Sequence, residues 1–353
     1  MGAILRAVGT YSPERILTNA DLEKILASSS QETSDAWIVQ RTGIRNRRIA
    51  QDDETVGSMA VAAARNALDH LSEPISPIEH VVFATNTAER PFPNGAGYVQ
   101  ARLRESHPSL IDAQAAGTDS YSGCAGVNFA LMYADALIRA GFFKTIGVVA
   151  SEKLSSVTNY ADRGTCILFG DGASFYLLSG NHPSAGFLGH FACGDGTQRE
   201  LIRCEPQQDK VTPSEAFRIL QTGGAPLRTK GDVLLLEGPA VFKYVQAQWK
   251  ELIRGFPSNR ALNPHGLSFD DIDYVAPHLA NLRNLCGIDD SHPGFLAKCG
   301  LSKDYNDDFC NSSTASPGKR VRTFMRESHS GQRLLMFGYG SGLQACAGLY
   351  EKP

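Results

Sequence analysis

The sequence of 353 residues predicts an α/β fold that contains much parallel sheet. Two observations predict this class. Short apolar runs with the length of buried strands alternate with longer stretches of helical periodicity, and such alternation is typical of parallel sheets covered by helices. The same order of elements also occurs twice along the chain, which indicates two similar halves packed back to back.

The expected elements follow from the spacing of the apolar residues. A stretch over 55–71 carries Ala60, Ala63 and Ala67 on one side and predicts a helix, as do the apolar spacing over 126–140 and the stretch 319–327. The runs expected as buried strands are 80–84, 145–150, 167–169, 174–178, 274–276 and 334–337.

We expect the two halves to cover residues 1–180, which carry a nucleophilic cysteine, and residues 181–353. Between them, the polar stretch 194–230 contains glycine and proline and is expected to be a junction and a surface excursion.

Composition excludes several classes of function. The chain has 34 basic and 37 acidic residues and a net charge of −3, which argues against general binding of nucleic acid or of anionic membranes. Its first twenty residues are interrupted by Arg6, Pro13 and Glu14 and do not resemble a signal peptide, and no uncharged apolar run has the length of a membrane span. We therefore expect a cytoplasmic protein.

The eight cysteines include no CxxC pair, so a zinc site or disulfide framework is not expected.

One cysteine has the context of a nucleophile. Cys124 lies between Gly123 and the start of the helix expected over 126–140. The first turn of a helix offers N–H groups without intrahelical partners and the positive end of the helix dipole, and both favour a thiolate over a thiol. The alternative interpretation is a small buried apolar residue, which is the more common state of an isolated cysteine.

Two further polar residues have positions typical of an α/β active site. His278 follows the apolar strand of YVAPHLAN, where Pro277 ends the regular pairing, so it is expected at a strand tip. Asn311 opens NSSTAS before the second-half helix, at the position equivalent to Cys124. Taken alone, they are interpreted as a loop histidine and a helix N-cap. In a repeated fold, two helix starts and one strand tip would converge on one pocket.

The glycine-rich FGYGSG over 337–342 is either an oxyanion site made of backbone N–H groups or a tight turn.

Taken together, these motifs resemble β-ketoacyl-acyl-carrier-protein synthase III, a family of the thiolase superfamily. The matching stretches are WIVQRTGI, SGCAGVNFAL, DRGTCILFGDGA, EGPAVFK, HLANLR and NSSTAS. They occur in the family's order, and the resemblance extends from about residue 1 to residue 350. It implies a five-layer αβαβα thiolase-like fold with two pseudo-symmetric halves and mixed sheets, a homodimer, and a reaction that needs no metal or other cofactor.

The resemblance also implies a mechanism. Cys124 attacks an acyl-CoA, and the backbone amides of Cys124 and Tyr339 hold the oxyanion. A malonyl thioester, carried by acyl carrier protein or by CoA, then loses carbon dioxide while His278 and Asn311 donate hydrogen bonds to its carbonyl. The resulting carbanion attacks the acyl group and gives a β-ketoacyl product.

Six binding residues are implied in the same way. The CoA adenine would lie between an indole and a guanidinium, with a second arginine near the phosphates. A supporting amide and a further arginine would contact pantetheine or the carrier protein, and one aromatic residue would enter the partner subunit's acyl pocket. In that order these residues are Trp37, Arg163, Arg41, Asn281, Arg283 and Phe92.

Three departures from the family pattern favour a divergent paralogue in a specialised pathway. The usual HQAN reads HLAN, NTSAASIP reads NSSTASPG, and the stretch 284–310 is rich in Gly, Pro and Asp where the family has an amphipathic helix with basic residues. YGSGLQACAG also resembles hydroxymethylglutaryl-CoA synthase. Two alternatives stay open: an enzyme that transfers the acyl group to an oxygen or nitrogen acceptor or condenses two acyl-CoAs, and a non-catalytic partner subunit.

Overall fold

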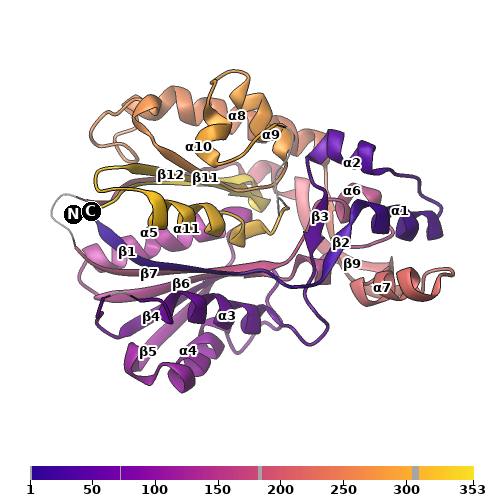
Figure 1. Ribbon diagram of the computed structural model, residues 1–353, viewed down its shortest axis with the longest axis horizontal. Coiled ribbons are helices and arrows are strands. Elements are labelled where there is room, and N and C mark those ends of the chain that lie inside the picture. The colour runs from indigo at the N-terminus through magenta and orange to yellow at the C-terminus, as the bar shows by residue number, and fades with distance from the viewer. Residues whose placement is uncertain (1, 72, 182–184, 304–309) are drawn as a thin grey trace.

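The computed structural model describes residues 2–71, 73–181, 185–303 and 310–353. Helices and sheets alternate in five layers (Figure 1): two helices, a sheet, two central helices, a second sheet, and an outer group of three helices. The first layer consists of α3 (Val56–Leu68) and α4 (Gly95–Ser106). The central helices are α5 (Gly126–Arg139) and α11 (Gly318–Glu327). The outer group consists of α8 (Gly238–Gly255), α9 (Leu282–Asp289) and α10 (Phe295–Cys299).

The first sheet has the strand order β1-β7-β6-β4-β5. The pairs β1/β7 and β7/β6 are antiparallel, whereas β6/β4 and β4/β5 are parallel. In sheet order the strands are β1 (Ala3–Tyr11), β7 (Gly172–Asn181), β6 (Thr145–Glu152), β4 (Ile78–Ala84) and β5 (Ile111–Ser120).

The second sheet repeats this plan. Its order is β8-β13-β12-β11, and the successive pairs are antiparallel, antiparallel and parallel, as in the first four strands of the other sheet. The strands are β8 (Gly186–Gly194), β13 (Gln344–Glu351), β12 (Arg333–Gly340) and β11 (Tyr274–Pro277). The predicted repeat is therefore present. The expected boundary at residue 180 falls at the end of β7, and the division into two domains stays a prediction.

Both sheets are mixed, as the resemblance implied, and both contain parallel pairs. Strand β12 is joined to β13 by the short turn Ser341–Leu343, and so brief a connection can only join antiparallel neighbours. The run 167–169 was expected as a strand, and this expectation is wrong. Only Phe169 pairs, in a single bridge to Asn311, because this segment is a turn buried under neighbouring elements. Strands β1, β5, β8 and β13 were not among the expected strands.

Helix α3 shows how local sequence sets an element and its packing. Thr55 and Ser58 form a reciprocal capping box at its start. Its small side chains let it approach the first sheet closely: a Cβ atom at Gly9 of β1 would lie 2.1 Å from the carbonyl oxygen of Ala63. Any larger residue at position 9 would push the helix away from the sheet.

Smaller elements gather at one end of the layers, on the right in Figure 1. They form two short antiparallel sheets, β2/β3 and β9/β10, with helices packed beside them. The elements are β2 (Ile16–Thr18), α1 (Asn19–Ser28), α2 (Asp35–Thr42), β3 (Asn46–Arg48), α6 (Arg163–Cys166), β9 (Ile202–Lys210), α7 (Pro213–Thr222) and β10 (Thr229–Leu236). Among the helices of the described residues, none has the length and apolar character to cross a membrane.

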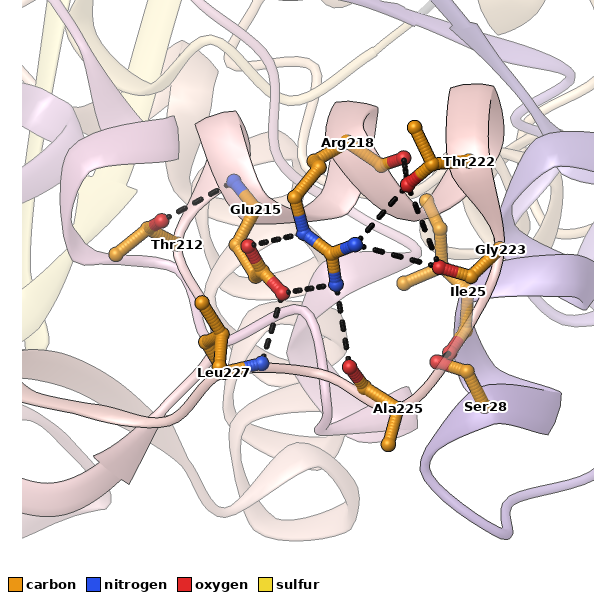
Figure 2. Close-up of polar contacts among 9 residues, drawn as sticks. All are labelled: Ile25, Ser28, Thr212, Glu215, Arg218, Thr222, Gly223, Ala225 and Leu227. Atoms are coloured by element: carbon orange, nitrogen blue, oxygen red, sulfur yellow. Dashed lines mark hydrogen bonds and ion pairs between the residues drawn. The ribbon is translucent and has the colours of Figure 1, made fainter.

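The stretch 194–230 is thus not a simple surface excursion. It contains β9 and α7, and Figure 2 shows the polar contacts that fix them. Thr212 caps α7, and the Glu215 carboxylate accepts hydrogen bonds from Arg218 Nε (2.8 Å) and Leu227 N (2.7 Å). Arg218 also donates to the carbonyl of Ala225 (3.1 Å). These contacts fold the polar loop after α7 back onto the helix.

This cluster gives stability a pH dependence. The hydrogen bond from Arg218 and that from the Leu227 amide lower the pKa of Glu215 to about 2 from 4.5. Because the folded-state pKa is depressed, the contribution is complete above pH 4.5 and is lost as pH falls toward 2. We expect Glu215→Gln to lower the melting temperature at pH 7 by roughly 1–3 °C, with the difference shrinking below pH 4.

The matched control is Glu251→Gln, which removes the exposed pair with Arg254 on α8. It should change the melting temperature by less than the Glu215 substitution. Thermal melts between pH 2.5 and 7 measure both, and a Glu215→Gln difference that stays constant over that range would contradict the assignment.

Candidate active site

A cavity of about 900 Å³ opens where the two halves meet the small elements. Its lining includes Cys124 from the start of α5, His278 after β11 and Asn311 before α11. The structure therefore brings together the two helix starts and the strand tip that the repeat predicted. Most of the exposed lining is apolar, which suits a site that excludes water from an acyl group.

Cys124 lies in the 3₁₀ turn η2 (Gly123–Ala125), directly before α5. Gly123 has φ of +59°, and a Cβ atom there would lie 2.6 Å from Ser341 N, so glycine is needed on both grounds. On the facing strand exit, a Cβ atom at Gly340 would lie 2.2 Å from Cys124 N. The glycine-rich exit of β12 thus packs directly on the backbone of the cysteine. Tyr339, the residue expected to supply an amide, is buried and lines the cavity one position earlier.

The thiol of Cys124 is not an anion at rest. Burial raises its pKa to about 12, and the negative charge of Glu152 adds to the rise, while hydrogen bonds from the Ser313 side chain and the backbone oppose it. The expectation that the helix start alone would hold a thiolate is therefore wrong. Desolvation penalises the charged form more than the helix start favours it. The side chain nevertheless remains partly exposed, on the cavity wall.

His278 is a buried, neutral imidazole. Its backbone N–H donates to Phe337 O at 2.8 Å, which places it at the tip of β11. Burial lowers the pKa of His278 to about 3, so the ring carries no charge near pH 7. Nδ1 lies 2.9 Å from Ser316 Oγ, a contact that orients the ring, and the ring of Tyr339 packs edge-on at 5.2 Å between centroids.

Asn311 is held by its backbone and by its side-chain oxygen. The backbone N–H donates to Leu168 O (3.2 Å), the carbonyl accepts from Gly170 N (3.0 Å), and Oδ1 accepts from Ser313 N (3.0 Å). The N-cap interpretation is wrong, because Ser312 and Pro317 are the N-cap residues of η7 and α11. With Oδ1 engaged, the amide nitrogen is the group that this side chain can offer to a ligand.

A buried carboxylate lies behind the cysteine and was not foreseen. Glu152 ends β6, is fully buried, and accepts hydrogen bonds from Asn86 Nδ2 (2.6 Å), Asn86 N (3.0 Å), Thr87 Oγ1 (2.8 Å) and Ser313 Oγ (3.0 Å). A signal was present in the sequence, because a charged residue directly after the apolar run TIGVVAS marks the carboxyl end of a strand, where α/β sites form.

The expected adenine-binding residues lie together but leave no slot between them. The guanidinium carbons of Arg41 and Arg163 lie 4.1 and 4.4 Å from the centroid of the Trp37 ring. Arg163 also donates to the carbonyl of Glu32 at 2.7 Å. A base between Trp37 and Arg163 would require Arg163 to move away from the indole, so the sandwich stays a prediction.

Asn281, Arg283 and Phe92 differ in their relation to the cavity. Asn281 caps α9 by accepting from Arg283 N (2.8 Å) and donates to the carbonyl of Arg41 (3.1 Å), so it links two walls. Arg283 lines the cavity, with its guanidinium 5.5 Å from the centroid of the Phe242 ring. Phe92 is outside the lining and 82% exposed.

The apolar wall of the cavity was also missed. It comes largely from β9, β10 and the start of α8, which the sequence patterns did not connect with the site. Its residues include Ile202, Cys204, Leu234, Leu236, Val241 and Val245.

Comparison with known proteins agrees with this geometry. The sequence profile described as 3-Oxoacyl-[acyl-carrier-protein (ACP)] synthase III matches residues 118–196. The beta-ketoacyl-[acyl-carrier-protein] synthase III of Chlamydia muridarum is 32% identical over 97% of both chains. The crystal structure of 3-oxoacyl-[acyl-carrier-protein] synthase III from Aquifex aeolicus VF5 superposes with a TM-score of 0.78 at 29% identity, covering 99% of this chain and 100% of that one. The priming β-ketosynthase of the R1128 polyketide pathway gives 0.80 at 28% identity, covering 99% and 96%.

The fold and the cavity thus define a thiolase-like condensing acyltransferase. The chain belongs to the 3-oxoacyl-acyl-carrier-protein synthase III family. The resemblance seen in its motifs and the five-layer fold that it implied are both confirmed. Among the described residues, no group of three or more His, Cys, Asp or Glu side chains is arranged to hold a metal ion.

The raised thiol pKa predicts how Cys124 reacts with a simple alkylating agent. Because the thiolate fraction grows tenfold per pH unit below a pKa of about 12, we expect iodoacetamide labelling of Cys124 to accelerate from pH 7 to pH 10 without a plateau. Peptide mass mapping separates Cys124 from the other seven cysteines. A labelling rate that levels off below pH 8 would mean that the cysteine is already a thiolate at rest.

Proposed function

We propose that the protein transfers an acyl group from an acyl-CoA to Cys124 and condenses it with a malonyl thioester, releasing carbon dioxide and a β-ketoacyl thioester. The observation that carries this proposal is the convergence of Cys124, His278 and Asn311 on one largely apolar cavity. A sulfur nucleophile and two neutral hydrogen-bond donors at one site are what a decarboxylative condensation requires.

In the first step, Cys124 attacks the thioester carbonyl and CoA leaves. The backbone amides of Cys124 and of the β12 exit are proposed to bind the oxyanion. Tyr339 was the residue expected to supply the second amide, and the contact between Gly340 and Cys124 N supports a role for this exit. Backbone donors are well suited here because they are fixed before the charge develops.

In the second step, His278 and Asn311 are proposed to donate to the malonyl thioester carbonyl and to stabilise the enolate formed as carbon dioxide departs. The neutral state of His278 supports this role. For Nε2 to donate from a neutral ring, Nδ1 must be the acceptor, so the Ser316 hydroxyl, which donates to Ser313 O at 2.8 Å, would turn to Nδ1. The Leu279 N–H donates to Ser316 Oγ at 3.1 Å, which holds the hydroxyl in place beside the ring.

The CoA site is proposed to lie along Trp37, Arg41, Arg163 and Arg283, with Asn281 supporting the wall between them. The cavity lined by four of these five residues supports this proposal. Both relatives named as synthase III act, by name, with acyl carrier protein, and the malonyl group is proposed to arrive on such a carrier or on CoA. No other cofactor is proposed.

We further propose a homodimer. Large aromatic side chains are exposed around α4 and at the end of β5, the outer strand of the first sheet. They are Phe92, Tyr98 and Tyr121. An exposed strand edge beside exposed aromatic residues favours association with a second copy. Phe92 would then enter the partner's acyl pocket.

The product separates this function from the two alternatives. Incubation with acyl-CoA and either malonyl-CoA or malonyl-acyl carrier protein, followed by mass spectrometry, should reveal loss of carbon dioxide and a β-ketoacyl thioester. Acyl transfer to oxygen or nitrogen, or condensation of two acyl-CoAs, would give a different product. A non-catalytic subunit would give none.

Cys124→Ala should abolish the acyl-enzyme adduct on exposure to acyl-CoA, because the variant has no nucleophile at this site. Intact-protein mass spectrometry measures the adduct, and Cys193→Ala is the control because this partly exposed cysteine is on β8, outside the cavity lining. An undiminished adduct on Cys124→Ala would remove Cys124 from the mechanism.

His278→Ala should still form the acyl-enzyme but lose condensation by about 10²–10³-fold, the usual cost of removing one donor to a developing oxyanion. The two half-reactions are followed separately, the first by adduct mass and the second by release of carbon dioxide. Full condensing activity in this variant would contradict the assigned role.

A further inference from the structure

Cys124 presents a chemical difficulty that the helix start does not solve. Its thiol is protonated at rest, yet the attack on a thioester requires the thiolate, so a proton must leave at the moment of reaction. His278 is a poor acceptor, because its pKa is lowered to about 3 and its Nδ1 is already in contact with Ser316. Tyr339, which also faces Cys124, is a weak acid whose pKa burial raises further, so it has no base to offer at pH 7.

The other group that faces Cys124 is Glu152, and Ser313 lies between the two. Ser313 is the first residue of the 3₁₀ turn η7 (Ser313–Ala315), which packs against η2. Its side chain hydrogen-bonds Cys124, and its Oγ lies 3.0 Å from Glu152 Oε1. Both Cys124 and Ser313 line the cavity. Ser313 keeps a φ of +48°, an uncommon conformation for a residue with a side chain.

The hydrogen-bond directions indicate that Glu152 is ready to accept a proton. The Thr87 hydroxyl accepts from Lys153 N (2.9 Å), so its own hydrogen points to the carboxylate at 2.8 Å. In the same way the Thr85 hydroxyl accepts from Thr87 N (3.1 Å) and faces Glu152 at 3.4 Å. Burial raises the pKa of Glu152 above its ordinary value, and the hydrogen bonds from Asn86, Thr87 and Ser313 oppose that rise by favouring the ionised carboxylate.

The same reasoning orients Ser313. Asn86 Nδ2 approaches its Oγ at 3.3 Å as a donor, so the hydroxyl hydrogen is directed to Glu152. A Ser313 hydroxyl turned this way has a lone pair to offer the thiol of Cys124, with which its side chain forms a hydrogen bond. The order of groups that a proton transfer to Glu152 requires is then S–H to Oγ, and Oγ–H to carboxylate.

We propose that Ser313 and Glu152 form a proton relay that activates Cys124 for acylation. This inference rests on the proposed function. As sulfur bonds to the thioester carbon, the thiol proton passes to Ser313 Oγ, and the Ser313 proton passes to Glu152, which becomes a carboxylic acid. When the tetrahedral intermediate breaks, the proton returns by the same path to the departing CoA thiolate. The products are the acyl-enzyme and CoA thiol, and Glu152 is again a carboxylate.

The relay predicts a specific loss in the acylation half-reaction. Ser313→Ala and Glu152→Gln should each slow single-turnover acylation at pH 7 by roughly 10²-fold, the usual contribution of positioned acid–base groups. The double variant should be no slower than the slower single variant, because both residues serve one path. At pH 10 the rates should approach that of the wild type, since hydroxide then takes the proton from Cys124.

A second readout separates the relay from a structural role. Acyl-enzyme of each variant is prepared at pH 10, returned to pH 7 and mixed with the malonyl thioester that the wild type uses. Condensation should stay within about threefold of the wild type, because no proton leaves Cys124 in this step. Ser312→Ala is the matched control: Ser312 is in the same segment but lines a small cavity away from Cys124, so both half-reactions should be kept.

Acylation of Ser313→Ala and Glu152→Gln at the wild-type rate would overturn the relay, as would an equal loss in both half-reactions. If Glu152→Gln does not fold, Ser313→Ala decides the question, because it leaves the carboxylate in place. Failure of the relay differs from failure of the proposed function, which would appear as an acyl adduct on Cys124→Ala.

Discussion

The site depends on the contact between two buried turns, η2 with Cys124 and η7 with Ser313. Gly126, the first residue of α5 after η2, also packs on η7, since a Cβ atom there would lie 2.9 Å from Thr314 Cγ2. Strand β6 ends in Glu152 beneath this contact, and its carboxylate accepts from Ser313 and Thr314 on one side and from residues 85–87 on the other. One buried carboxylate therefore ties the first sheet to the turn that carries the second half's polar residues.

Burial of this contact sets the chemistry. Desolvation favours the neutral forms of both Cys124 and His278, raising the pKa of one and lowering that of the other. A neutral imidazole suits stabilisation of an enolate, but a neutral thiol is a poor nucleophile. In the proposed function, the same dry environment would assist the second half-reaction and hinder the first, and the proposed relay through the carboxylate behind the cysteine would resolve this conflict.

The family relationship accounts for the layers, whereas part of the cavity wall comes from smaller elements beside them. Strands β9 and β10 bring apolar side chains to the cavity, and the Glu215–Arg218 cluster fixes the loop beside them (Figure 2). Near the mouth, Arg41 and Arg163 stack on Trp37. A base inserted between Trp37 and Arg163 would therefore have to displace an existing stacking contact.

Periodicity and motif order were enough to predict the α/β class, the helices α3, α5 and α11, and the candidates Cys124, His278 and Asn311, because each depends on residues close together in the sequence. The polar edge strand β5 and the pairing directions were not predictable in this way, since they depend on neighbours distant in the chain. Nor was the charge state of Cys124: the helix start is visible in the sequence, but the desolvation that outweighs it comes from packing against residues distant in the chain, such as Gly340. Burial is a property of the assembled interior, so only folding could establish which of the two effects is larger.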